Sequence, residues 1–134
     1  MKYIIAFIIL AAFIQCTLSI KCRSDYREFN GKCWQIKKDS RSRRSEAQTR
    51  CIQAGGYLAR HLDDKDKKYL DVFTHQQGVK LWIGLSYKAA WDDGSEVLEG
   101  VVHGPKIDKC IYIKSKEYHS TNCNDEMGYV CMQR

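Results

Sequence analysis

The number and spacing of cysteines constrain the fold of this chain more than any other feature. Seven cysteines occur in 134 residues, and Cys16 lies inside an apolar N-terminal segment. The other six follow that segment: Cys22, Cys33, Cys51, Cys110, Cys123 and Cys131. An even number in an exported domain of this size is typical of three disulfides. A zinc site is the weaker interpretation, because no Cys-x-x-Cys pair and no Cys/His cluster has zinc-like spacing.

The first nineteen residues have the features of a secretory signal. A lysine at the second position precedes an apolar run over 3–14, which is too short to span a bilayer. Thr17 and Ser19 are small residues that suit cleavage after Ser19. We therefore expect a signal peptide at 1–19, one domain at 20–134 and secretion to the extracellular space. A membrane anchor is the rival interpretation, and cleavage before Cys16 would leave a free or interchain thiol.

The charge of the chain excludes some classes of partner. The formal net charge is +6, and it falls to +5 when the single cation of the signal is removed. This modest charge is compatible with anionic surfaces but is far below that of nucleic-acid binders. No later segment is apolar enough to cross a membrane. We expect no nucleic-acid partner and no membrane span, and the sequence does not predict an oligomeric state.

Local patterns predict two early helices and several later strands. Asn30-Gly31 lies between two strand-like runs and predicts a hairpin. Apolar spacing predicts one helix over 45–54, ended by a glycine pair, and a second over about 64–75 with acidic residues at its start. Short strands are predicted at Leu81–Leu85, Cys110–Ile113 and Tyr129–Met132, with a mostly irregular loop over Ser86 to Lys109. This order indicates an α+β fold.

Several short motifs, taken together, resemble the C-type lectin-like domain family over Cys22 to Cys131. They are Gly31-Lys32-Cys33-Trp34, Ala47-x-x-x-Cys51 followed by Gly55-Gly56, Trp82-Ile83-Gly84-Leu85, the Trp91-Asp92-Asp93-Gly94 turn, and Tyr129-Val130-Cys131. The resemblance implies two helices packed on short antiparallel sheets with a long loop region. It also implies that the three tryptophans belong to the core.

The resemblance selects one of the fifteen possible pairings of six cysteines. It implies Cys22–Cys33, Cys51–Cys131 and Cys110–Cys123. The Cys51–Cys131 bond would close a loop of about eighty residues, which the chain-entropy estimate values at roughly 4.5 kcal/mol.

Sugar-binding members of this family chelate calcium with carboxylate and amide oxygens, and this chain departs from their pattern. Gly104-Pro105-Lys106 stands in place of Glu-Pro-Asn or Gln-Pro-Asp, and Tyr118-His119-Ser120 stands in place of Trp-Asn-Asp. Asp108, two residues before Cys110, is the one strong calcium ligand that remains. We therefore expect no metal and no other cofactor, although Asn122, Asn124, Asp125 and Glu126 leave an unconventional cation site open. The candidate ligand face consists of His103, Lys106, Asp108, Tyr118 and His119, in which the two histidines could approach each other.

A basic stretch before the first helix offers a second candidate surface. Five cations fall within eight residues: Lys37, Lys38, Arg41, Arg43 and Arg44. One interpretation is a solvated loop and helix entry, and the other is a patch for an anionic ligand. Arg44 occupies a position where the family usually has an aromatic residue, which favours a polar entry to the helix.

The sequence therefore predicts a secreted, non-catalytic recognition module. Its expected partner is an extracellular protein or an anionic glycan, bound without calcium coordination of sugar. Carbohydrate binding through an atypical site is the first alternative, and a structural or surface-interacting extracellular protein is the second. We expect no enzymatic activity, because no nucleophile–base pair, phosphate-binding loop or paired-carboxylate motif occurs.

Overall fold

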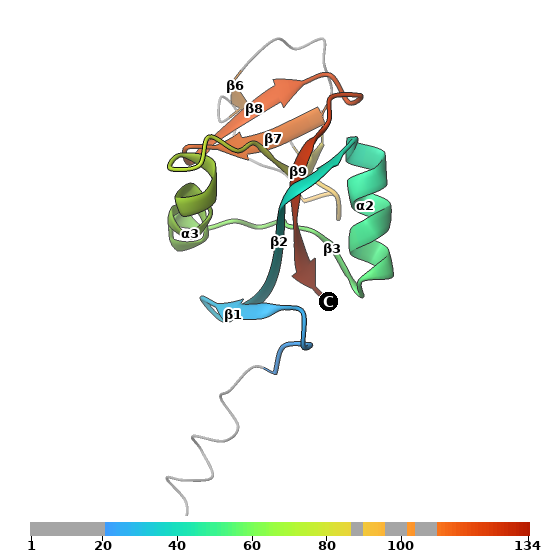
Figure 1. The fold of residues 1–134 in the computed structure, drawn as a ribbon, viewed down its shortest axis with the longest axis vertical. Helices are drawn as coiled ribbons and strands as arrows, with labels where there is room; N and C mark the ends of the chain where they lie inside the picture. The colour runs from blue at the N-terminus through green and yellow to red at the C-terminus, as the bar shows by residue number, and fades with distance from the viewer. Residues whose placement is uncertain (1–20, 87–89, 96–101, 104–109) are drawn as a thin grey trace, which may run out of the picture.

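The computed structural model describes residues 21–86, 90–95, 102–103 and 110–134 (Figure 1). The predicted signal peptide and most of the predicted loop lie outside these residues. Within them, no helix is both long enough and apolar enough to cross a membrane.

The first helix, α2 (Arg44–Gln53), forms where the apolar spacing predicted it. Ala47 and Cys51 are fully buried one turn apart, so a single face of α2 packs on the sheet. Gly55 follows the helix with a φ of 79°, a left-handed conformation that suits glycine at a helix end. No side chain caps the start of α2, and its first backbone amide instead donates to the Cys123 carbonyl at 3.4 Å.

The second helix, α3 (Asp64–Thr74), begins with a reciprocal capping box. The Asp66 amide donates to the Asp63 carboxylate at 2.8 Å, and the Asp63 amide donates to the Asp66 carboxylate at 3.1 Å. Both predicted helices are confirmed to within one residue at each end.

The hairpin predicted at Asn30-Gly31 joins β1 (Arg27–Phe29) to β2 (Lys32–Ser42). Asn30 and Gly31 have φ values of 52° and 71°, as a two-residue type I′ turn requires.

Strand β2 continues through the basic stretch, so the predicted loop there is wrong. Strand β9 supplies the partner that the local sequence could not show, with Lys37 opposite Tyr129 and Ser42 opposite Met127. Gly128 permits this contact, because a Cβ atom there would lie 2.8 Å from the Lys37 carbonyl oxygen.

The described strands form one mixed sheet in the order β1-β2-β9-β4-β7-β8-β6, with β3 paired to β9 and β5 to β4. The bounds of the remaining strands are β3 Gly56–Leu58, β4 Leu81–Ser86, β5 Ala90–Trp91, β6 Val102–His103, β7 Cys110–Lys114, β8 Glu117–Thr121 and β9 Met127–Gln133. The α+β class is confirmed. The expectation of antiparallel pairing is incomplete, because β4 runs parallel to β9 and β6 runs parallel to β8. In Figure 1, α2 and α3 lie on opposite sides of β2 and β9. Strands β7, β8 and β6 lie at the top of the view, at the end of the sheet away from β1.

The three tryptophans are core residues, as predicted. Trp34, Trp82 and Trp91 are 1%, 0% and 7% exposed. The Trp82 indole nitrogen donates to the Ser42 carbonyl at 2.8 Å, which satisfies its polar atom inside the core.

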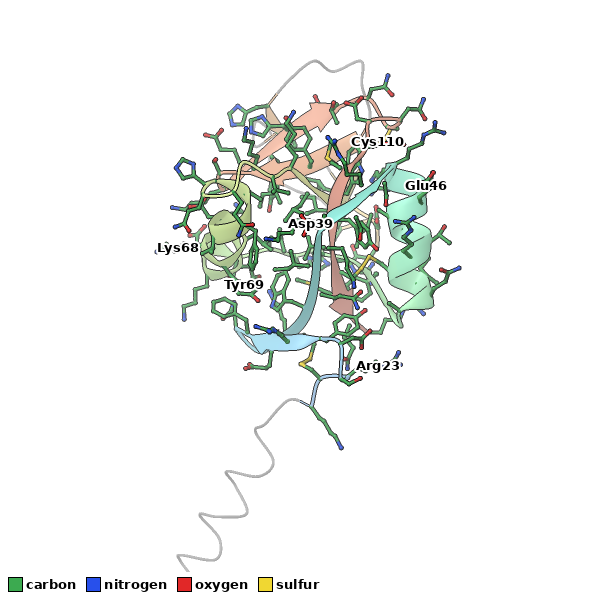
Figure 2. All side chains as sticks on the ribbon, in the orientation of Figure 1. Arg23, Asp39, Glu46, Lys68, Tyr69 and Cys110 are labelled. Atoms are coloured by element: carbon green, nitrogen blue, oxygen red, sulfur yellow. A yellow bond between two sulfur atoms is a disulfide. The ribbon has the colours of Figure 1, made fainter. Side chains whose placement is uncertain are left out.

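The three disulfides have the implied pairing. Cys22–Cys33 joins the N-terminal segment to β2, Cys51–Cys131 joins α2 to β9, and Cys110–Cys123 joins β7 to the turn after β8. The Cα–Cα distances are 5.5, 5.4 and 5.0 Å, within the usual range for disulfides. Cys110 lies at the β7–β8 end of the sheet (Figure 2).

Candidate functional site

A row of ring-bearing side chains crosses the β7–β8–β6 end of the sheet in register. Trp82 of β4 pairs with Tyr112 of β7, Tyr112 pairs with His119 of β8, and His119 pairs with His103 of β6. Directly paired residues project to the same face of a sheet, so the four rings share one face. Trp82 is buried, Tyr112 and His119 are half-buried, and His103 is exposed. The row therefore runs from the core to the surface.

The rings are in mutual contact and carry cations at their margin. The Tyr112 and His119 rings stack with centroids 5.2 Å apart, and the His103 and His119 centroids are 5.8 Å apart. The Lys80 ammonium lies 5.1 Å from the Tyr112 ring centroid, within cation–π range. We call the set Lys80, His103, Tyr112, Lys114 and His119 the histidine face.

The electrostatics of the histidine face disfavour a charge on His119 at neutral pH. Burial lowers the pKa of His119, and the nearby His103, Lys114 and Lys80 lower it further. Glu117 acts in the opposite direction, with its carboxylate 3.7 Å from His119 Nε2 and 58% exposed. The face holds two lysines and two titratable imidazoles against this one carboxylate.

The structure brings together two of the five residues predicted for the ligand face. His103 and His119 approach each other, as expected from the sequence. Tyr118 does not join them: it is 2% exposed, and its ring meets Trp91 edge-on at 6.0 Å. The alternation of β8 turns Tyr118 into the core and His119 outward, and burial raises the pKa of Tyr118. Lys106 and Asp108 lie outside the described residues.

Sequence reasoning missed Lys80, Tyr112 and Lys114. Tyr112 alternates with Ile111 and Ile113, which are 2% and 0% exposed, so the period of two along β7 already placed Tyr112 on the opposite face. The contact of Lys80 with Tyr112 had no local signal, because the pairing of β4 with β7 spans about thirty residues.

On β8, the described residues differ from the calcium ligands of sugar-binding lectins. Calcium requires six to eight oxygen ligands, whereas β8 offers an imidazole from His119 at the matching position. The alternative cluster after β8 is engaged within itself: the Thr121 hydroxyl donates to Asp125 at 2.5 Å, and the Asn124 amide donates to the Asn122 side chain at 2.9 Å. Across the part of the chain that the structure describes, no three or more His, Cys, Asp or Glu side chains gather as metal ligands.

The basic stretch divides into outward and inward cations. Lys37, Arg41 and Arg43 are exposed, whereas Lys38 is half-buried, its ammonium bonded to the Gln77 side chain at 2.5 Å. Arg44 points inward, so its assignment to the anionic-ligand patch is wrong.

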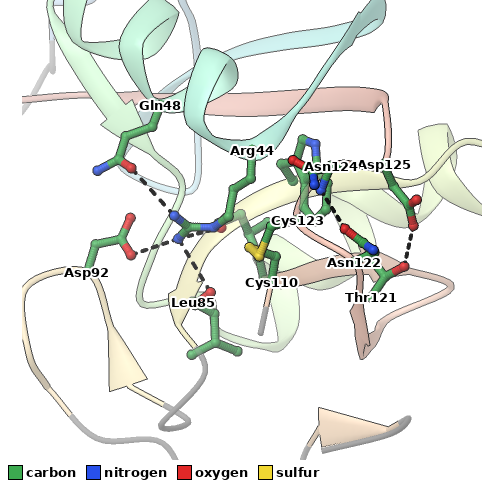
Figure 3. Close-up of a disulfide and its surroundings, with 12 residues drawn as sticks. Arg44, Gln48, Leu85, Asp92, Cys110, Thr121, Asn122, Cys123, Asn124 and Asp125 are labelled. Atoms are coloured by element: carbon green, nitrogen blue, oxygen red, sulfur yellow. Dashed lines mark hydrogen bonds and ion pairs between the residues drawn. A yellow bond between two sulfur atoms is a disulfide. The ribbon is translucent and has the colours of Figure 1, made fainter. Parts of the chain in front are cut away.

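The Arg44 guanidinium is held in an internal ion pair. It contacts the Asp92 carboxylate at 2.8 Å and the Leu85 carbonyl at 3.4 Å, and its side chain is only 13% exposed (Figure 3). Its buried Nε atom has no hydrogen-bond partner among the described residues. The polar helix entry inferred from the sequence therefore serves to connect α2 to the turn after β5.

A third histidine has a structural contact. His61 Nε2 lies 2.5 Å from Asp93 Oδ2 and 3.4 Å from the Ser95 hydroxyl, which itself donates to Asp93 Oδ1. Because the serine and the aspartate meet the same imidazole nitrogen, the aspartate does not orient the opposite nitrogen as a catalytic triad requires. The bonds from Ser95 and His61 lower the pKa of Asp93, and they fix the turn from which the loop region starts.

Solved structures of known proteins share this architecture. The C-type lectin domain of murine dendritic cell inhibitory receptor 2, in complex with N-glycan, superposes with a TM-score of 0.71 at 19% identity, covering 85% of this chain and 99% of that chain. A calcium-independent type II antifreeze protein superposes with a TM-score of 0.71 at 18% identity, covering 86% and 95%.

Sequence comparisons give the same family. The chain is 30% identical to a fowlpox virus (strain NVSL) protein that bears a C-type lectin name, FPV003/FPV258, over 93% of this chain and 94% of that protein. It is 27% identical to the human early activation antigen CD69 over 82% of this chain, but it spans only 55% of CD69. A family model for the lectin C-type domain matches residues 40–133. This chain therefore belongs to the C-type lectin-like domain family, whose members are generally non-catalytic recognition proteins.

Proposed function

We propose that this protein is a secreted recognition module that binds an anionic extracellular ligand through the histidine face, without calcium. The observation that carries the proposal is the in-register row Tyr112–His119–His103, with Lys80 against its tyrosine ring. Three disulfides suit an oxidising, extracellular location. N-terminal sequencing of protein recovered from culture medium should begin at Ile20.

The chemistry of the histidine face favours sulfate or carboxylate groups. Lysine ammonium groups are strongly hydrated point charges that pair with such anions, and protonated imidazoles add donors. The Tyr112 ring offers a flat apolar surface beside them. Both an acidic protein segment and a sulfated glycan carry these anions. We therefore propose binding to the anionic groups, and the experiments below distinguish the two classes of ligand that carry them.

Independence from calcium is part of the proposal. An imidazole at the position of a calcium-ligating amide supplies no oxygen ligand. One of the solved neighbours is itself described as calcium-independent, so the fold does not require the ion in every member.

Heparin-affinity chromatography of the secreted protein tests the anionic ligand. We expect elution by moderate salt, because the screening length shortens to roughly 3 Å near 1 M. The double variant Lys80→Gln/Lys114→Gln should elute at clearly lower salt, whereas the control Lys65→Gln/Lys68→Gln, with exposed lysines of α3, should not. Equal elution of wild type and the first variant would disprove a role of the histidine face.

The source of the ligand can be separated on cells. Loss of binding after heparinase and chondroitinase treatment indicates a glycan. Binding that survives these enzymes but is lost after trypsin treatment indicates a protein. Binding that is abolished by chelator and restored by calcium would instead support carbohydrate recognition through a calcium site.

A second candidate surface for the anionic ligand is formed by three exposed cations, Lys37, Arg41 and Arg43. If this surface carries the heparin retention, Arg41→Ser/Arg43→Ser will shift elution more than Lys80→Gln/Lys114→Gln. Arg44 is omitted because its loss would disturb the internal ion pair with Asp92.

A further inference from the structure

A hollow of about 440 Å³ lies beside α2, formed by residues distinct from those of the histidine face. We call it the helix hollow, and its lining includes Gln48, Ile52, Tyr57, Arg60, Asp92 and Arg134. Gln48 and Ile52 are one turn apart on α2, and Tyr57 comes from β3. The volume lies within the usual range of ligand-binding sites.

Two arginine side chains of the helix hollow, Arg60 and Arg134, have no carboxylate side-chain partner among the described residues. The Arg60 guanidinium stacks 3.8 Å from the Tyr57 ring centroid, which fixes its orientation, and Arg134 is exposed at the rim. Asp92 does not neutralise these arginines, because it is already paired with Arg44 at 2.8 Å. Gln48 also contacts Arg44, so the inward arginine lies behind the wall of the hollow (Figure 3).

The hollow also has an apolar side. Ile52 is 50% exposed, and the described chain has only one other exposed large hydrophobic residue, Val72 on α3. Leu58 also borders the hollow but is only 1% exposed, so Ile52 supplies the apolar surface that a ligand can reach. An exposed isoleucine beside two arginines that lack carboxylate side-chain partners suits an amphipathic anionic ligand.

We propose that the helix hollow is a docking site for an acidic segment of a partner protein. Its carboxylates pair with Arg60 and Arg134, and one of its apolar side chains covers Ile52. A sulfated glycan would satisfy the arginines but would leave the exposed Ile52 facing a polar ligand, so this isoleucine favours a peptide. The carboxylate geometry suits arginine, whose planar guanidinium can donate two parallel hydrogen bonds to the two carboxylate oxygens at once.

The test is an NMR titration of the ¹⁵N-labelled mature protein with the peptide acetyl-Glu-Leu-Asp-Glu-amide. We expect saturable shifts of the amides of Gln48, Ile52, Tyr57 and Arg60. Arg60→Gln and Arg134→Gln should each weaken binding roughly fivefold, and Ile52→Ser should weaken it roughly threefold. These residues are at the surface, and unchanged spectra elsewhere in the protein verify folding.

Control variants outside the helix hollow test whether the loss of peptide binding is specific to the hollow. Val72→Ser removes the other exposed hydrophobic residue, and Lys68→Gln removes a cation of α3, which lies on the side of the molecule away from α2 (Figure 2). Neither should change the affinity. The amide peptide acetyl-Gln-Leu-Asn-Gln-amide should not bind.

Three results would overturn the proposal. They are equal binding of the amide peptide, shifts confined to Tyr112, Lys114 and His119, and tighter binding of a heparin hexasaccharide than of the peptide at the same amides. The result is independent of the proposed function, because Lys80→Gln/Lys114→Gln alters the histidine face and leaves the helix hollow intact.

Discussion

Two polar clusters of this molecule differ in how their charges are satisfied. At the hairpin, Asp66 is fully buried and accepts hydrogen bonds from Asn30 and from the Asp63 amide, and its carboxylate pairs with the Lys32 ammonium. On the histidine face, Glu117 lies 3.7 Å from His119, which forms an ion pair with it only when protonated, and the rings remain partly exposed.

How fully the charges of a cluster are paired distinguishes residues that stabilise the fold from residues available to a ligand, and amino-acid composition does so less well. A buried charge with a full set of partners is fixed, and its removal costs stability. Charges that are left partly solvated contribute little to folding and remain available to a ligand. We therefore expect changes of the buried, paired charges at the hairpin to alter folding, and changes at the histidine face to alter binding more than folding.

The largest effect should follow from removing a disulfide of the scaffold. Cys51–Cys131 closes a loop with a sequence separation of 80, so Cys51→Ser/Cys131→Ser should lower the free energy of unfolding by about 4.5 kcal/mol. Cys110–Cys123, with a separation of 13 at the other end of the sheet, should cost about 3 kcal/mol. Denaturation in urea measures both, and a larger loss for the Cys110–Cys123 pair would reverse the assignment of scaffold and site.

Asp66→Ala should be nearly as damaging as the loss of a disulfide. Removing the carboxylate leaves the Lys32 ammonium and the Asp63 amide without their partner, and it deletes one half of the capping box of α3. Breaking a buried ion pair costs about 3 kcal/mol. Asp64→Ala, a change of an exposed carboxylate on the same helix, is the control and should cost about 0.5 kcal/mol in urea denaturation. Equal losses for the two variants would show that the buried cluster is not special.

The histidine face should respond to pH in binding more than in stability. Because burial lowers the pKa of His119, the neutral form predominates at pH 7.5 and protonation takes place below the ordinary histidine value of 6.5. An anionic ligand favours the charged form, so affinity for heparin should rise roughly fivefold as the pH falls from 7.5 to 5. The free energy of unfolding should change in the opposite direction: the contribution of His119 is complete above pH 6.5 and declines as the pH falls below it.

Variants identify the group responsible for the pH response. Fluorescence-detected binding should show a flat profile for His103→Gln/His119→Gln. His75→Gln, which alters the histidine that follows α3 and bonds to Ser115, should keep the wild-type slope. Lys80→Gln should weaken binding at every pH without flattening the curve. A slope that survives the double histidine change would assign the response to another group.

The sequence predicted the scaffold more completely than the site, and the reason is physical. Helix periods, the Asn30-Gly31 turn and the cysteine spacing are local or family-wide signals, and the two helices, the hairpin and the three disulfides agree with them. The site depends on cross-strand register, which arises from pairings between distant segments.

Particular residues illustrate this limit of local patterns. Tyr118 was grouped with His119 because they are adjacent, yet adjacent strand residues face opposite sides. Arg44 was counted with the exposed cations because nothing nearby in sequence indicated Asp92 as its partner. The contact of His103, which lies within the predicted loop, with His119 confirms the expectation that these two histidines approach each other.

The smallest expected effect is that of calcium on thermal stability. An intact calcium site filled to a hundred times its dissociation constant would add about 2.7 kcal/mol to the free energy of unfolding. For a domain of this size that corresponds to a rise of about 10 °C in the melting midpoint. Here His119 and the buried Tyr118 replace oxygen ligands on β8, and Asp125 already accepts a bond from Thr121. Melting curves recorded with millimolar calcium and with chelator should therefore differ by about 1–2 °C.

Asp108→Ala provides the control, because it removes the one strong ligand that the sequence retains, and it should leave the small difference unchanged. A shift near 10 °C that Asp108→Ala abolishes would mean that the protein binds calcium through Asp108, and the histidine face would then be part of a metal-dependent site.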